Sequence, residues 1–313
     1  MDYELACREL VRALRGRRSQ VALQRRLGRS SNVLHAWETG ARYPKATDLL
    51  QLLQVSGRSP TELLAQLAPC HGTTARALLT SWLNALVRDK PHVEVARRLG
   101  VNRNTVARWL AGETEPRVPQ LLAMVEATTQ RVLDFLAELA DVPSVAAAQA
   151  DLRRQRDLAY SQPWAHAVLR ALELEHYRAL PRHEPGVLSD SCGISGEEER
   201  RALDALLRAG QIAKRGQRLR PRRVLAVDTR ESPAGNLALK RHWFKVVSDR
   251  LALSGVPEGG LASYNLFAIA EADLARIREA HLDYYERIRS IVAESRNPTR
   301  VVLTTIGLLP LGP

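Results

Sequence analysis

Apolar residues recur every three to four positions along most of the chain, and this spacing predicts a mainly helical protein. The clearest pattern lies in residues 91–112, PHVEVARRLGVNRNTVARWLAG, which contain two short apolar stripes. The second stripe, through Val106 and Trp109, follows Asn102, a residue type that favours the helix N-cap. It stops at Gly112, the usual left-handed residue after a helix. Residues 91–112 are therefore predicted to form two short helices joined by a tight turn.

The same pattern occurs a second time, 72 residues upstream. A shift of 72 without gaps places RRLG at residues 25–28 on RRLG at residues 97–100. The other matched pairs include Asn32 with Asn104, Trp37 with Trp109, Gly40 with Gly112 and Pro44 with Pro116. A match kept over about 60 residues indicates two similar modules. In each, two helices meet at a tight turn and leave one polar face outward, which is the arrangement of a helix-turn-helix.

Each module is predicted to contain five helices. In the first module they cover residues 3–16, 19–27, 30–39, 45–55 and 59–67, and the second module repeats this spacing between residues 74 and 140. We therefore expect one domain at residues 1–69 and another at residues 73–141. Trp37 and Trp109 are expected in the core, because their spacing from Leu34 and Val106 places them on the inward stripe.

This layout, with a tryptophan and a glycine three residues apart at the end of the third helix, resembles the Cro/C1-type (XRE-like) helix-turn-helix family of phage repressors. Residues 35–40, HAWETG, are similar to the family's usual ending of that helix. The second module departs from it, with Leu110 where the family most often has glutamate. The resemblance implies a transcriptional regulator that binds double-stranded operator DNA.

The resemblance also implies which positions read bases. They are Arg103, Asn104 and Arg108 in the second module, and Ser31, Asn32 and Ala36 in the first. Arginine can bond O6 and N7 of guanine, and asparagine can bond N6 and N7 of adenine. The second module is therefore expected to be the better reader. The open alternative is that Arg103 and Arg108 are solvated surface residues on a helix used only for packing.

Contacts to the DNA backbone are expected from the start of the second helix and from basic residues near helix ends. The residues are Gln20, which matches a glutamine frequent in the family, its counterpart His92, and Arg17, Arg18, Arg25 and Arg97. Arginines crowd near the helix ends of the first module. The first module is therefore expected to contribute mainly affinity and positioning on the DNA. Asn32 is its most specific expected base contact.

Beyond the two modules, residues 142–162 are predicted to form a helical linker. Residues 163–230 read as three helices followed by two short strands with Gly216 at their turn, which describes a winged-helix-like unit. Nine basic residues lie between Arg200 and Arg223 and favour contact with a polyanion, but the last helix starts with three glutamates, Glu197–Glu199, that phosphates would repel. Two alternatives stay open: a structural or dimerising unit, and an auxiliary backbone contact through the wing.

Residues 231–313 are expected to form an α/β regulatory or dimerisation domain. A helix from Pro233 precedes a strand at 263–269, a long helix at 271–295 and a last strand at 299–309. The order of elements from about residue 162 resembles a domain of unknown function found behind helix-turn-helix modules in bacterial regulators. The resemblance implies regulation and supplies no ligand. The fold class is therefore mainly α with a small α/β C-terminal part.

Composition narrows the choice of partner. The chain of 313 residues is 45% hydrophobic and 26% charged, as in soluble globular proteins, and its excess of 12 positive charges favours a polyanion. The three cysteines have no metal-like spacing and suit a reducing cytoplasm, so no metal or cofactor is expected. The sequence contains no stretch of 18 uncharged apolar residues, so no membrane span is predicted. The charged N-terminal segment does not suit a signal peptide.

The search for catalytic motifs finds no nucleophile elbow, phosphate-binding loop, dinucleotide fingerprint or zinc-protease box, so no enzyme is expected. The hypothesis is a cytoplasmic, nucleoid-associated repressor that binds DNA and forms a homodimer through its C-terminal half. That half would also respond to an effector of undefined class, a small molecule, peptide or protein. The alternative is a protein-interaction regulator, an antitoxin-like or defence- or phage-associated factor, whose helix-turn-helix units are mainly scaffolds.

Overall fold

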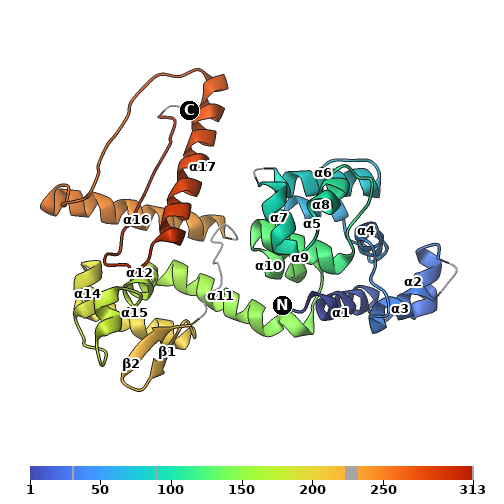
Figure 1. Ribbon diagram of the computed structural model, residues 1–313, viewed down its shortest axis with the longest axis horizontal. Helices are drawn as coiled ribbons and strands as arrows, with labels where there is room; N and C mark the ends of the chain where they lie inside the picture. The colour runs from blue at the N-terminus through green and yellow to red at the C-terminus, as the bar shows by residue number, and fades with distance from the viewer. Residues whose placement is uncertain (30–31, 89, 223–231, 312–313) are drawn as a thin grey trace. The chain divides into compact units, whose positions relative to one another are not determined.

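The computed structural model describes residues 1–29, 32–88, 90–222 and 232–311. The chain divides into two compact units, unit 1 at residues 1–152 and unit 2 at residues 153–313 (Figure 1). Within the described residues, no helix has both the length and the apolar character needed to cross a membrane. The mainly helical fold class with a small sheet is confirmed, and the finer division into five segments stays a prediction.

Unit 1 contains both modules, each with the five predicted helices. The first module has α1 (Tyr3–Arg15), α2 (Gln20–Arg26), α3 (Val33–Thr39), α4 (Ala46–Val55) and α5 (Pro60–Ala65). The second has α6 (Ala75–Val87), α7 (His92–Leu99), α8 (Arg103–Leu110), α9 (Val118–Thr129) and α10 (Val132–Leu139). Trp37 and Trp109 are buried, as expected, together with Leu34 and Val106. These four residues anchor the inward faces of α3 and α8.

Glycine is required at the end of both recognition helices, α3 and α8. Gly40 and Gly112 have φ of +84° and +71°, in the left-handed region that other residues rarely adopt. A Cβ atom would lie 2.9 Å from Arg8 Cδ at Gly40, and 2.9 Å from Thr80 Oγ1 at Gly112. In both copies, one glycine therefore has two roles. It ends the recognition helix, and it leaves room for the first helix of the same module to approach closely.

The two modules pack directly against each other. Helix α1 contacts α9, α6 contacts α4, and α5 contacts α10. The backbone N–H of Ala46 donates to Pro116 O at 3.0 Å, and that of Val118 donates to Pro44 O at 2.9 Å. The fully buried Trp82 donates its indole N–H to Leu64 O at 2.9 Å. The sequence predicted two adjacent domains, at residues 1–69 and 73–141, and the structure adds a shared core.

After α10 come a short 3-10 helix, η1 (Pro143–Val145), and α11 (Ala146–Ser161). Both lie in the segment that was predicted to form a helical linker. Unit 2 continues with α12 (Pro163–Ala171), α13 (Glu175–Ala179), α14 (Val187–Cys192) and α15 (Gly196–Arg208). Strands β1 (Ile212–Arg215) and β2 (Arg218–Pro221) then pair antiparallel. Val168, Leu188 and Leu206 lie at the centre of this core. A two-stranded hairpin follows the helices, as predicted, but four helices precede it where the sequence predicted three, because α13 is separate from α12. Residues 223–230 lie outside the described part.

The rest of unit 2 corrects one prediction. Helices α16 (Pro233–Ser254) and α17 (Glu271–Glu294) form, but residues 263–269 and 299–309 are not strands. Leu261 and Tyr264 are 91% and 90% exposed, and α16 buries none of its residues. A strand needs a hydrogen-bonded neighbour, and no described segment supplies one, so the strand-helix-strand prediction is wrong for the chain by itself.

We expect Trp82→Ala to destabilise unit 1 by about 3–5 kcal/mol, because a large buried side chain is removed from the junction of the two modules. Urea unfolding followed by circular dichroism measures the loss, and amide hydrogen exchange locates it. Helices of both modules should lose protection together. The exposed Val93→Ala is the control and should change stability by less than about 0.5 kcal/mol. Loss of protection confined to the second module would contradict a shared core.

Candidate nucleic-acid interface

Helix α8 is held by one face and presents the other to solvent. The Asn102 side chain caps the helix by accepting a hydrogen bond from the Asn104 N–H at 2.8 Å. Val106 is buried on the inward face. Arg103, Asn104 and Arg108, the predicted base readers, are all exposed. The three side chains therefore lie on one short, rigidly anchored helix.

Two of these three side chains carry no competing bond. Within the described residues, no hydrogen bond or ion pair joins the Arg103 or Asn104 side chain to another group. Arg108 is different, because its Nε lies 3.3 Å from Glu113 Oε2. The side chains of this pair are 58% and 62% exposed, so the interaction is weak and water competes with it. A guanine edge can replace Glu113 at little cost.

The first module presents a smaller reading face. Asn32 is exposed at the N-cap of α3, and its side chain makes no capping hydrogen bond. Ala36 is half-buried, and Ser31 lies outside the described residues. Asn32 is therefore the one predicted reader of this module that the structure places on the surface.

A buried carboxylate organises the first module and was missed by sequence reasoning. Glu38 accepts from Arg15 Nε at 2.5 Å and from Gln20 Nε2 at 2.7 Å, and its backbone oxygen accepts from Arg12 at 2.6 Å. The amide of Gln20, a predicted backbone contact, is thus held by Glu38. The network ties the start of α2 to the end of α3. It fixes the angle between the two helices of the helix-turn-helix.

In the second module, apolar side chains hold the recognition helix where the first module uses this polar network. The positions of Arg15 and Glu38 are taken by the buried Val87 and Leu110. Asn84, at the position of Arg12, donates to Leu110 O at 2.9 Å, as Arg12 does to Glu38 O. The sequence carried a signal for this exchange, because all three positions change together between the two copies.

The remaining predicted backbone contacts surround these helices. His92, at the first position of α7, is exposed, as are Arg17, Arg25 and Arg97. Arg18 is half-buried, and its backbone oxygen accepts from Arg15 at 2.8 Å. The positive groups lie at the ends of α1, α2 and α7, where a phosphate backbone on α3 or α8 would pass. Whether they bind DNA stays a prediction.

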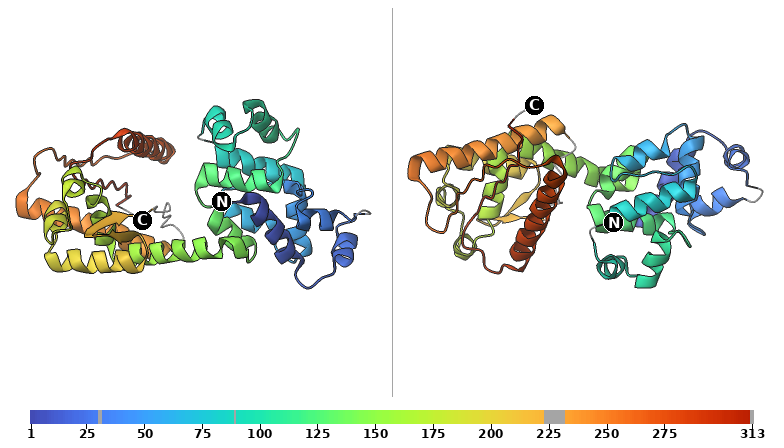
Figure 2. Two further views of the ribbon diagram at one scale, coloured as in Figure 1. Left: turned by 60° about the horizontal axis from the view of Figure 1, so that its bottom comes forward. Right: turned by 90° about the horizontal axis from the view of Figure 1, so that it is seen from above.

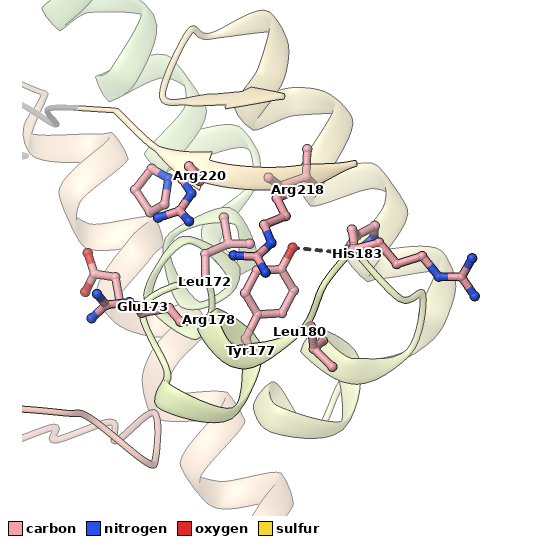
Figure 3. Close-up of a pocket in the computed structure, with 11 residues that line it drawn as sticks. Leu172, Glu173, Tyr177, Arg178, Leu180, His183, Arg218 and Arg220 are labelled. Atoms are coloured by element: carbon pink, nitrogen blue, oxygen red, sulfur yellow. Dashed lines mark hydrogen bonds between the residues drawn. The ribbon is translucent and has the colours of Figure 1, made fainter. Parts of the chain in front are cut away.

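Unit 2 contains a basic hollow beside its hairpin. It measures about 270 Å³, and its lining includes Tyr177, Arg178, Arg218 and Arg220. Figure 3 shows Arg218 extending from β2 toward the Tyr177 ring, with Arg220 beside it. Burial raises the pKa of Tyr177 to about 12, so its hydroxyl is neutral and bonds His183 Nδ1 at 3.1 Å. The chemistry of this lining suits an anion.

The glutamates that open α15 form a smaller negative surface than the sequence suggested. Glu199 is buried and accepts from the backbone N–H of Ser189 at 2.7 Å. Glu198 completes a capping box with Ser195, and Glu197 pairs with Arg201. Glu198 and Glu199 therefore have structural roles, whereas the Glu197 side chain is 58% exposed. The like-charge objection to DNA contact by this unit is therefore weaker than the sequence implied.

The folds and exposed faces of both modules define a helix-turn-helix DNA-binding regulator. Family models agree: a helix-turn-helix domain matches residues 8–67, and a second helix-turn-helix model matches residues 90–129. A third model, Domain of unknown function (DUF4423), matches residues 144–311, more than half of the chain. The chain therefore belongs to the DUF4423 family. No curated protein and no solved structure matches it. The expected tandem modules with a C-terminal domain of unknown function are confirmed.

We expect Glu38→Leu to destabilise the protein by about 1–3 kcal/mol, because it leaves the half-buried Arg15 and the Gln20 amide without their acceptor. The double variant Arg15→Val/Glu38→Leu copies Val87 and Leu110 of the second module. It should recover part of the loss. Urea unfolding of wild type, both single variants and the double variant measures the coupling. A double variant with the summed loss of the two single variants would show that the exchange between modules is not coupled.

Proposed function

We propose that this protein is a transcriptional repressor that reads operator DNA with both helix-turn-helix modules. The observation that carries the proposal is α8, where Arg103, Asn104 and Arg108 share an exposed face while Val106 and Trp109 are buried beneath them. A helix held in this way can enter the major groove with its side chains already placed. The net charge of +12 adds affinity for any duplex.

The two modules divide the work in this proposal. The second module supplies most of the base contacts, through two arginines and one asparagine. The first module supplies one base contact, through Asn32. It also supplies phosphate contacts from Arg17, Arg18 and Arg25. The Glu38 network also holds Gln20 at the start of α2, where the DNA backbone would pass. The protein would act in the cytoplasm at the nucleoid.

Arg103→Ala should weaken binding to the selected operator by about 5- to 150-fold, the equivalent of about 1–3 kcal/mol for one bidentate guanine contact. Binding to random duplex should fall much less. Arg18→Ala should lower both affinities and reduce the slope of log affinity against log salt by about one unit. Fluorescence anisotropy over a salt series measures all four constants.

Arg276→Ala is the matched control, since its side chain is 81% exposed on α17, far along the chain from both modules. It should leave operator affinity unchanged. Equal losses from Arg103→Ala and Arg18→Ala on operator and random DNA would rule out the division between reading and positioning.

The proposal includes a homodimer formed through the C-terminal half. Residues 233–311 carry many large apolar side chains that face solvent in the single chain. They include Leu237, Phe244, Leu253, Leu261, Tyr264, Leu266, Phe267, Val302, Leu309 and Leu311. Soluble monomers rarely expose apolar surface on this scale. The extended segments 263–269 and 299–309 also have backbone groups available for strand pairing with a second copy.

Sedimentation velocity on the full chain should show a dimer at micromolar concentration. Leu266→Asp/Leu309→Asp should shift it toward monomer, because the charges enter the apolar surface. Leu207→Asp places the same charge on an exposed leucine of α15 and should leave the dimer intact. A wild-type monomer at these concentrations would contradict dimerisation.

A second candidate function is a protein-interaction regulator of the antitoxin-like, defence- or phage-associated kind. The observation in its favour is the same apolar surface of residues 233–311, which a different protein could also cover. A purified protein that enriches no sequence from random duplexes would favour this candidate. An effector role for the C-terminal half stays a prediction, with a ligand of undefined class.

A further inference from the structure

The hydrogen bonds between the two modules are reciprocal. Ala46 N–H donates to Pro116 O, and Val118 N–H donates to Pro44 O. Residue 118 is the counterpart of 46, and 116 is the counterpart of 44, at the shift of 72 that aligns the repeats. The pair encloses an antiparallel bridge between the equivalent residues Lys45 and Arg117. When a residue of the first copy contacts a different residue of the second, and their counterparts make the same contact in reverse, the interface is isologous and has two-fold symmetry.

The helices obey the same reciprocity. Helix α1 packs on α9, and its counterpart α6 packs on α4, the counterpart of α9. Helices α5 and α10 are equivalent and contact each other. There Gln66 and Glu138, again 72 apart, meet at 3.4 Å. Arg58 donates to Glu138 O, and Arg131 donates to Gln66 O, so the acceptors are equivalent and the donors differ by one position. A pseudo-two-fold axis therefore passes between Lys45 and Arg117 and between Gln66 and Glu138.

This axis determines how the recognition helices are placed. A two-fold rotation keeps height along its axis, so α3 and α8 lie at the same level on opposite sides. Short loops connect each to the Lys45–Arg117 end of the axis: residues 40–45 follow α3, and residues 111–117 follow α8. Figures 1 and 2 show the α2–α3 and α7–α8 pairs on opposite sides of unit 1, in all three views. Exposed Arg42 adds positive charge near that end, whereas Lys45 pairs with Glu115 at 3.3 Å.

We infer that one chain acts as an internal dimer and binds two inverted half-sites that differ in sequence. The inference rests on the proposed function. Asn32 and Asn104 are equivalent in the sequence repeat, and both are exposed at the start of their helices, Asn32 as the N-cap of α3 and Asn104 as the second residue of α8. An adenine is therefore expected in both halves. They differ where the modules differ. Arg103 and Arg108 have Ser31 and Ala36 as counterparts, so guanines are expected only in the half bound by α8.

Selection of bound sequences from random duplex DNA by the purified full chain tests the inference. The expected site is an imperfect palindrome whose half-site centres are about 10 base pairs apart, one turn of the duplex. Arg103→Ala should remove a guanine preference from one half only. Asn32→Ala should remove an adenine preference from the other half only. Both side chains are exposed, so neither change should affect folding.

Native mass spectrometry of the complex formed by the full-length Leu266→Asp/Leu309→Asp variant, in which dimerisation through residues 233–311 is weakened, then counts chains for each inverted pair. One chain for each pair is expected, including in a complex of two chains that covers two pairs. Two chains on a single pair, a direct repeat, or loss of preference in the same half from both substitutions would overturn the internal dimer. Enrichment of no sequence at all would instead contradict the proposed function, so the two failures are distinguishable.

Discussion

The packing of one module on the other is the constraint on which the rest of unit 1 depends. Two backbone hydrogen bonds around Lys45 and Arg117, and the bond from the buried Trp82 to Leu64 O, hold the repeats together. The bonds lie directly after the recognition helices, at the start of α4 and α9. A rotation of one module would break both bonds and move its recognition helix. The rigidity of the reading surface therefore comes from the interface between repeats, more than from either module by itself.

Duplication also allowed the two modules to diverge inside a fixed frame. The first holds its recognition helix with a carboxylate that gathers Arg15 and Gln20. The second uses Val87 and Leu110 for the same purpose and needs only Asn84 for the helix end. Both modules keep a glycine after the recognition helix, Gly40 and Gly112, in the left-handed region. The two modules also differ outside this frame, where Arg103 and Arg108 of the second correspond to Ser31 and Ala36 of the first.

The sequence predicted unit 1 well because its information is local and repeated. The five helices, the buried Trp37 and Trp109 and the exposed Arg103 follow from periodicity, caps and comparison of two copies. The reciprocal interface did not follow, since it depends on which surfaces meet across 72 residues. In unit 2 the same reasoning failed for segments 263–269 and 299–309. Their alternating pattern indicates one face that prefers burial, but it cannot say whether the covering partner lies in the same chain.

That failure bears on how the two halves of the protein cooperate. Repressors with one helix-turn-helix per chain need a dimer to bind two half-sites, whereas this chain carries two helix-turn-helix modules within unit 1. Dimerisation through residues 233–311 would therefore serve another purpose. It would join two complete readers, so that binding of one raises the effective concentration of the other at a second site. Affinity for a single operator would then depend on unit 1, and occupancy of paired operators on the apolar surface of unit 2.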